Sequence, residues 1–299
     1  WGTIQTPLII NGILVNPDAH ALEGFDQYTG RKLWRTEAAN IGAAAEQLAA
    51  SDKHVYIKYE KVLVQLDLLT GKEVASFQTQ FGREHGWNWF AVSDDGKTVY
   101  GATAGGIFAS EMLSGEANLR WKHGGPAAKE KIGGMIAMSD GRIYVVGGDV
   151  TDAQRAAAIA EMRAWFARQP KDLRDEFESQ TDKRDIRLLT AIDAATGKIL
   201  YRRGVDTSNC GGAFLRPVAY GAKARQGYDP YIMSDIYAHN DVLLIASRGR
   251  TDKGWGMWNR GAYQARAMTA RDGKTGDLLW YRFANYRGRP AIVEDSVIA

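Results

Sequence analysis

The side chains best suited to bind a ligand gather between residues 248 and 263. This segment holds four glycines, two tryptophans, one tyrosine, three arginines and one lysine. A connection of that length and aromatic content is usually functional, because ordinary connections in compact domains are shorter. We therefore expect a ligand site here, with an ordinary surface loop as the alternative. The binding residues would be Arg248, Arg250, Trp255, Trp258, Arg260 and Tyr263.

Two further segments carry side chains that could contact a ligand. The first contains His85 and Trp87, whose indole could stack on a sugar or a planar ring; the alternative is that Trp87 packs between strands. In the second, Arg216 could hold a carboxylate or sulfate through two hydrogen bonds, or have a structural role. Cys210 lies in a polar, glycine-rich stretch that could leave its thiol near a channel. Without a basic activator, a cysteine is usually an inert buried residue, which is the alternative for Cys210.

Several common active-site patterns are missing from the sequence. No two of the five histidines have the spacing of metal ligands, so no metal site is expected. The chain has no nucleophile elbow, no P-loop and no haem-attachment motif. A net charge of +3 without runs of like charge argues against nucleic-acid binding. No stretch of 18 apolar residues predicts a transmembrane helix.

A short repeated phrase surrounds these candidate segments. It consists of an acidic residue, two variable residues, Thr or Ser, and Gly, and an aromatic usually follows. The acidic side chain and the hydroxyl can accept hydrogen bonds from turn amides, and glycine supplies a positive φ, so each copy predicts a β-hairpin. We expect the following aromatic to pack between neighbouring hairpin units. The five copies are Asp26–Gly30, Asp67–Gly71, Glu111–Gly115, Asp193–Gly197 and Asp272–Gly276.

The spacing of the copies indicates a β-propeller. Gly30, Gly71 and Gly115 follow one another at the period of about 40–45 residues that is typical of one four-stranded blade. The steps to Gly197 and Gly276 are about twice as long, so they hold either two blades or one blade with insertions. We favour insertions, which predicts an all-β fold of about five blades and the start of a sixth.

The phrase resembles that of the bacterial quinoprotein-type (PQQ-like repeat) β-propellers, which runs Ala-x-Asp-x-x-Thr-Gly-x-x-x-Trp. The segment Ala191–Tyr201 is the most similar copy, and the resemblance covers nearly the whole chain. The repeat is shared by quinone-dependent alcohol dehydrogenases and by non-enzymatic propellers such as the outer-membrane assembly lipoprotein. The resemblance therefore implies the architecture and a periplasmic or secreted location in the cell envelope, and it leaves the activity open.

The family's dehydrogenases characteristically carry an adjacent Cys-Cys pair beside the quinone. This chain has Cys210 followed by glycine. The resemblance thus favours a non-catalytic scaffold that binds a carbohydrate or an envelope protein and carries no cofactor. The alternative is a PQQ-dependent dehydrogenase, or a degenerate relative of one, with PQQ and calcium.

Residues 151–185 predict a helical insertion. Thr151 or Asp152 can cap a helix, apolar residues then recur at steps of three and four, and Pro170 ends the pattern. A second helix is expected at 171–180. We expect the pair to cover an edge of the propeller; a lid or docking surface anchored by its Trp-Phe pair is the alternative.

The two ends of the chain share one pattern, proline, apolar run, polar turn and apolar run, at 6–15 and 289–298. We therefore expect residues 1–299 to form a single propeller domain that is a fragment of a longer one. A closed ring of five blades is the alternative.

Overall fold

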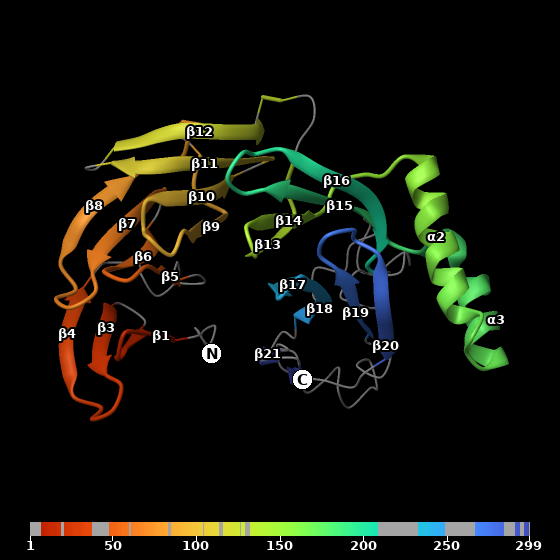
Figure 1. Cartoon of the computed structure of the whole chain (residues 1–299), viewed down its shortest axis with the longest axis horizontal. Helices are drawn as coiled ribbons and strands as arrows, with labels where there is room; N and C mark the ends of the chain where they lie inside the picture. The colour runs from red at the N-terminus through yellow and green to blue at the C-terminus, as the bar shows by residue number, and fades with distance from the viewer. Residues whose placement is uncertain are drawn as a thin grey trace, which may run out of the picture. The chain divides into compact units, whose positions relative to one another are not determined.

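In the part of the chain that it describes, the computed structural model contains five four-stranded antiparallel sheets followed by a two-stranded sheet (Figure 1). In every sheet, strands that are consecutive in the sequence pair with each other. The structure describes residues 7–18, 21–37, 48–59, 61–82, 85–103, 105–113, 116–125, 127–128, 132–208, 233–248, 267–283, 291–293 and 296–298.

The sheets follow the order of the repeat. The first contains β1 (Leu8–Ile10), β2 (Ile13–Pro17), β3 (Ala21–Asp26) and β4 (Lys32–Glu37). The second contains β5 (Leu48–Ala50), β6 (His54–Tyr59), β7 (Val62–Asp67) and β8 (Glu73–Phe77). The third contains β9 (Trp89–Val92), β10 (Thr98–Thr103), β11 (Gly106–Leu113) and β12 (Glu116–Gly124).

The remaining strands complete the series. The fourth sheet contains β13 (Met135–Ser139), β14 (Arg142–Val146), β15 (Ile186–Asp193) and β16 (Ile199–Asp206). The fifth contains β17 (Met233–His239), β18 (Val242–Arg248), β19 (Ala267–Asp272) and β20 (Leu278–Phe283). The pair β21 (Ala291–Val293) and β22 (Ser296–Ile298) begins a further sheet. The prediction of four-stranded blades, about five in number with a sixth begun, is confirmed.

The chain divides into two compact units. The first comprises residues 1–133 together with 194–197, and the second comprises 134–193 together with 198–299. Each unit has its own buried apolar core. In the second unit the core joins the inward faces of two sheets to the aromatic side chains of the helical insertion.

The repeated phrase closes the hairpin between the third and fourth strands of a sheet. In the first copy, the Asp26 carboxylate accepts hydrogen bonds from the Thr29 amide and hydroxyl, both at 2.8 Å. In the second copy, the Asp67 carboxylate accepts hydrogen bonds from the amide and hydroxyl of Thr70. In the fifth copy, the Asp272 carboxylate accepts one from the Thr275 amide at 2.9 Å. These carboxylates therefore order the turn before the strand resumes.

The glycine that ends the phrase has a positive φ in every copy where it is described. The angles are 69° at Gly30, 67° at Gly71, 75° at Gly197 and 77° at Gly276. Only glycine adopts this conformation without a steric penalty, which explains its recurrence. Gly115 of the third copy lies outside the described residues.

Three of the aromatics after the phrase pack against the turn of the following copy. Within the first unit, the Trp34 indole donates a hydrogen bond of 2.9 Å to the carbonyl of Leu68, and Trp121 donates one of 2.9 Å to Ala194. Within the second unit, the Tyr201 hydroxyl donates to the Gly273 carbonyl at 3.0 Å. The expectation that this aromatic joins neighbouring hairpin units is confirmed for these three positions.

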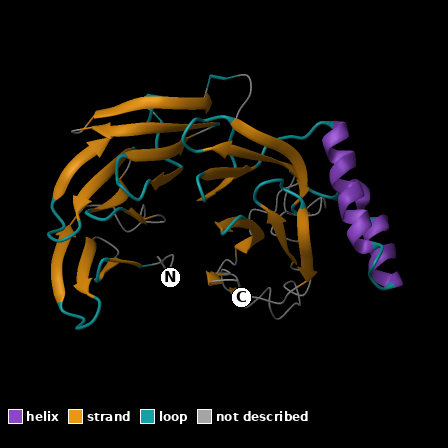
Figure 2. Ribbon diagram, in the orientation of Figure 1, coloured by secondary structure: helices purple, strands orange, loops and turns teal. Residues whose placement is uncertain are grey.

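The helical insertion lies between β14 and β15, drawn in purple in Figure 2. It consists of α2 (Asp152–Phe166), α3 (Lys171–Ser179) and the short 3-10 helix η1 (Thr181–Lys183). Thr151 caps α2, because its hydroxyl accepts the Gln154 amide while the Gln154 side chain accepts the Thr151 amide. Both predicted helices are confirmed.

Candidate functional site

Most of the predicted ligand-binding residues lie outside the described part of the chain. These are Cys210, Arg216, Arg250, Trp255, Trp258, Arg260 and Tyr263. The backbone of Arg248 is described as the last residue of β18. A ligand site on these residues therefore stays a prediction.

Trp87 is a core side chain in the first unit. Its indole is 1% exposed, donates a hydrogen bond of 3.3 Å to the Phe77 carbonyl, and packs against the Phe108 ring at 5.2 Å between centroids. His85 is half-buried in the loop before it, and its carbonyl accepts the Thr79 hydroxyl at 3.1 Å. Stacking of a ligand on Trp87 would require this core contact to open.

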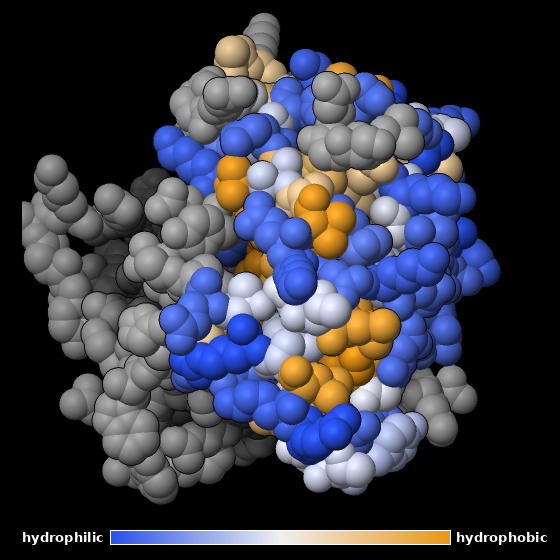
Figure 3. Space-filling model, turned by 90° about the vertical axis from the view of Figure 1, so that its left-hand side faces the viewer, coloured by the Kyte–Doolittle hydropathy of each residue, from blue (hydrophilic) through white to orange (hydrophobic). Residues whose placement is uncertain are grey.

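The surface seen in Figure 3 is mostly hydrophilic, with small separate apolar patches. In the first unit the exposed large apolar residues include Leu33, Leu69 and Val74. Single exposed residues of this kind are usual on soluble proteins and indicate no binding site by themselves.

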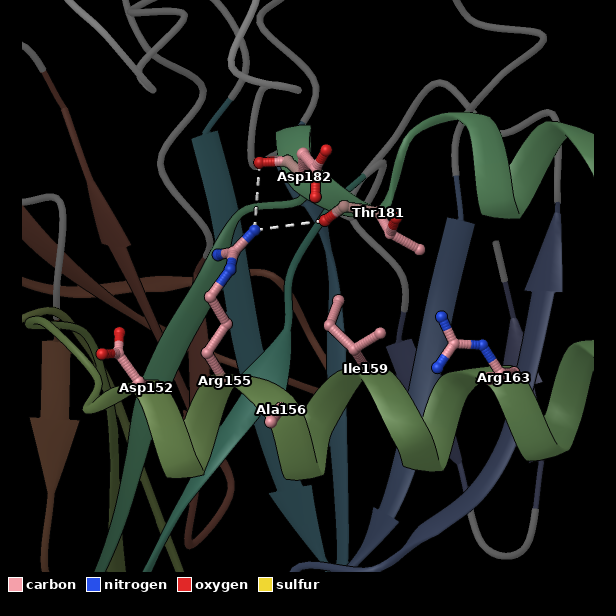
Figure 4. Close-up of a pocket in the computed structure, with 7 residues that line it drawn as sticks. All are labelled: Asp152, Arg155, Ala156, Ile159, Arg163, Thr181 and Asp182. Carbon is pink, nitrogen blue, oxygen red and sulfur yellow. Dashed lines mark hydrogen bonds between the residues drawn. The ribbon is translucent and has the colours of Figure 1, made fainter.

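A groove of about 340 Å³ runs along the helical insertion (Figure 4). Its floor is formed by α2, and the segment around η1 forms the opposite wall. The residues that line it are Asp152, Arg155, Ala156, Ile159, Arg163, Thr181 and Asp182.

The two arginines of the groove are already engaged by the protein. The Arg155 guanidinium donates to the carbonyls of Thr181, Asp182 and Arg184, at 3.1 to 3.2 Å. Arg163 forms a two-point ion pair with Glu178, at 2.6 and 2.9 Å. This pair lowers the pKa of Glu178, chiefly through the hydrogen bond from Arg163. Both arginines thus hold α2 against the segment that follows it.

The carboxylates of Asp152 and Asp182 are exposed at the rim of the groove. In the described part of the chain, neither carboxylate forms a hydrogen bond or ion pair. Ala156 and Ile159 provide the apolar part of the lining. A lysine or arginine side chain matches this arrangement, because its aliphatic stem can lie on the floor while its charged end meets a carboxylate.

Glu161 fixes α2 to the sheets of the second unit. Its carboxylate accepts Arg203 of β16 at 2.9 Å, Arg271 of β19 at 2.8 Å, and the backbone amide of Leu278 at 3.0 Å. Arg271 is fully buried, so Glu161 neutralises a charge that would otherwise be costly to bury. One side chain therefore connects the helix to two sheets.

The aromatic pair at the end of α2 faces the interior of its own unit. Phe166 is 2% exposed and stacks on Phe177 of α3 at 4.6 Å between centroids. Trp165 packs against Tyr281 of β20 at 5.2 Å. The pair stabilises the insertion, so any partner would have to contact other residues of the two helices.

A buried polar cluster lies at the end of α3 and the start of the segment that leads to Cys210. Arg184 is 3% exposed, pairs with Asp206 at 2.6 Å, and stacks on the Phe177 ring. The Thr207 hydroxyl donates to the Asp185 carbonyl at 2.9 Å. Burial raises the pKa of Asp185, and the nearby Arg187 opposes that rise. The cluster fixes the backbone up to residue 208.

Sequence reasoning missed Glu161 and this cluster. An acidic residue in a helix such as α2 usually lies on the solvated face, so nothing in the local sequence indicates that Glu161 binds the buried Arg271. Arg271 carries a weak signal, because it lies in the strand β19, in which Ala267 to Arg271 are all buried, and a buried arginine requires a partner. Among the described residues, no three metal-ligating side chains come together. No described helix is long and apolar enough to cross a membrane.

Comparison with known proteins identifies the fold. No protein-family model matches the sequence, and no curated protein matches it. Among solved structures, BamB from Moraxella catarrhalis is similar, with a TM-score of 0.51 and 13% identity over 98% of this chain and 68% of that one. The quinohemoprotein alcohol dehydrogenase from Comamonas testosteroni has a TM-score of 0.50 and 14% identity over 94% of this chain. The match spans 43% of the dehydrogenase. The chain therefore has the β-propeller fold that these two proteins share.

Proposed function

We propose that this protein is a non-catalytic propeller scaffold of the bacterial cell envelope, and that its helical insertion binds a protein partner. The observation that carries the proposal is the groove beside α2, held in one shape by Arg155, Arg163 and Glu161. A preformed surface loses little conformational entropy on binding, which favours recognition. The similarity to BamB is consistent with a scaffold and does not identify its partner.

The chemistry of the groove suggests a basic polypeptide segment as the partner. Asp152 and Asp182 offer two exposed carboxylates, while Arg155 and Arg163 are occupied within the protein. A lysine or arginine of the partner would pair with a carboxylate and lie over Ile159. Pairs of this kind at an exposed site are weak and sensitive to salt, so binding should decrease as ionic strength rises.

Two alanines of α2 allow a matched test. Ala156 lines the groove, whereas Ala157 is exposed on the same helix outside it. We expect a fluorescein-labelled peptide of alternating lysine and leucine to bind the wild-type protein and Ala157→Arg equally well. Ala156→Arg should bind it at least tenfold more weakly in fluorescence anisotropy, because the new side chain fills the groove and adds a positive charge. Equal binding by both variants would exclude the groove as the site.

The alternative, a PQQ-dependent dehydrogenase, makes a different prediction. The protein would be mixed with PQQ and calcium, passed through a desalting column, and examined by absorption spectroscopy. A scaffold should retain no quinone. A stoichiometric quinone spectrum would reject the non-catalytic proposal, whatever the result of the peptide experiment.

A further inference from the structure

The outer strand of the fifth sheet has an unusual composition. Strand β20 reads Leu-Leu-Trp-Tyr-Arg-Phe, with five apolar residues, one arginine and no acidic residue. The outer strands β4, β12 and β16 each carry three charged residues, and β8 carries one, Glu73. Each of these four strands has an acidic residue, which β20 lacks. Charged residues on an outer strand discourage pairing with another chain, and an apolar outer strand lacks this protection.

The outer edge of β20 is free of strand pairing in the described part of the chain. Only β19 pairs with β20, and it lies on the other side. At the start of the strand, the Leu278 amide turns away from β19 and is accepted by Glu161 of α2 at 3.0 Å. Leu279 is 51% exposed and Phe283 is 41% exposed. The edge beyond Leu278 therefore has two exposed apolar side chains and no strand paired to it in the described part of the chain.

The helical insertion provides a contact at the far end of this edge. Phe283 lines a small hollow together with Leu173 and Phe177 of α3. Arg282 is exposed between the two apolar positions. A strand added along this edge would thus contact the apolar Leu279, the positively charged Arg282 and the apolar Phe283 in that order.

We propose that the outer edge of β20 binds an extended polypeptide segment of a partner by β-strand addition. The segment carries apolar residues at alternate positions and an acidic residue that meets Arg282. Main-chain hydrogen bonds supply the affinity, and the side chains around Leu279 and Phe283 supply the selectivity. This surface is separate from the α2 groove and extends the proposed function without depending on it.

A second copy of this chain is a poorer occupant. Two six-residue strands paired edge to edge bury far less surface than the roughly 1,200 Å² found in stable interfaces. A flexible segment needs no such area for weak or transient binding, because it pairs with the strand and contacts Phe283 with a small part of its length. The charge of Arg282 also favours an acidic partner over the β20 strand itself, which has no acidic residue.

The probe is a fluorescein-labelled peptide of alternating valine and threonine with one central aspartate. We expect it to bind the full chain in fluorescence anisotropy, and a form with alternate amides N-methylated to bind at least tenfold more weakly. Leu279→Lys and Phe283→Lys should weaken binding to a similar extent. Leu33→Lys, an exposed position on the outer strand β4, is the matched control and should have no effect. Ala156→Arg should also have no effect, which separates this surface from the groove.

The proposal would be overturned if neither N-methylation of the peptide nor the β20 variants changed the binding affinity. It would also be overturned if the peptide did not bind at millimolar concentration. Sedimentation of the wild-type chain tests the other occupant. A concentration-dependent dimer abolished by Leu279→Lys would show that a second copy takes the edge, and would refute a foreign segment. The N-methylation comparison uses only wild-type protein, so the test stands even if a variant does not fold.

Discussion

Replacing Gly71 by alanine tests whether the packing between successive repeats stabilises the first unit. Gly71 has φ at 67°, and Gly30, its equivalent in the preceding copy, has φ at 69°. Because alanine is strained in the left-handed conformation, placing it at either position should reduce the free energy of unfolding by about 1–2 kcal/mol. The two positions differ in what surrounds them, so the same substitution separates backbone strain from packing.

The packing contribution follows from the space around each glycine. A Cβ at Gly71 would lie 2.6 Å from Cδ2 of Trp34 and 2.7 Å from Oγ1 of Thr36, whereas a Cβ at Gly30 has no atom within 4 Å. Trp34 is 7% exposed and bonded to the Leu68 carbonyl, so it has little room to retreat. Overpacking of this kind costs about 1–3 kcal/mol. We expect Gly71→Ala to lose about 2–5 kcal/mol in total, and Gly30→Ala to lose only the strain of about 1–2 kcal/mol.

Urea unfolding followed by tryptophan fluorescence and circular dichroism measures both losses. The midpoint should fall further for Gly71→Ala than for Gly30→Ala, with the slope of the transition unchanged. Gly141→Ala supplies a second control, because φ there is 70° and no atom lies near the added carbon. Equal losses at Gly71 and Gly30 would refute the idea that the tryptophan packs tightly beneath the next turn.

Three further outcomes are expected. Trp34→Phe keeps a ring under Gly71 but leaves the Leu68 carbonyl without its donor, which should cost about 1–3 kcal/mol in the same urea assay. Glu161→Ala leaves the buried Arg271 charge unpaired and should cost about 3–5 kcal/mol; hydrogen exchange at the Leu278 amide should accelerate, and unchanged exchange would contradict the assigned contact. Hydrogen bonds donated by Thr70 lower the pKa of Asp67, and those donated by Ser139 and the Asp241 amide lower the pKa of Asp140. A carboxyl group with a lowered pKa stabilises the fold above the unfolded-state pKa of about 3.9, and this stability is lost as the pH falls below that value. The urea midpoint should therefore decrease as the pH is lowered through and below about 3.9, and Asp67→Asn should reduce the decrease.

Much of the fold could be predicted from local sequence. The phrase from Asp26 to Gly30 specifies a turn by itself, because its carboxylate, hydroxyl and glycine satisfy the turn amides and the positive φ without help from distant residues. The helix α2 is equally local, since Thr151 and Gln154 cap it reciprocally. Three hairpins at the period of one blade, with two further copies at about twice that step, then indicate a propeller.

The candidate site could not be predicted in the same way. Trp87 has the residue type of a stacking platform, yet the rings of Phe90 and Phe108 enclose it. Residue type gives the chemistry that a side chain can perform, and burial decides whether a ligand can reach it. The groove beside α2 depends on Arg155 reaching carbonyls that are more than 25 residues away, a contact without a local pattern.

The sequence by itself determined the repeated hairpins and the position of the inserted helices, because those features depend on hydrogen bonds and periodicities within a few residues. The structure decided that each long step between copies holds one four-stranded sheet among the described residues. The tertiary structure alone decided which charged groups are exposed. Glu161 and Asp152 are both acidic residues of α2, but Glu161 is joined to Arg203 and Arg271 while Asp152 stands at the rim of the groove. That difference arises from the strands against which each turn of the helix packs, so no window of the sequence contains it.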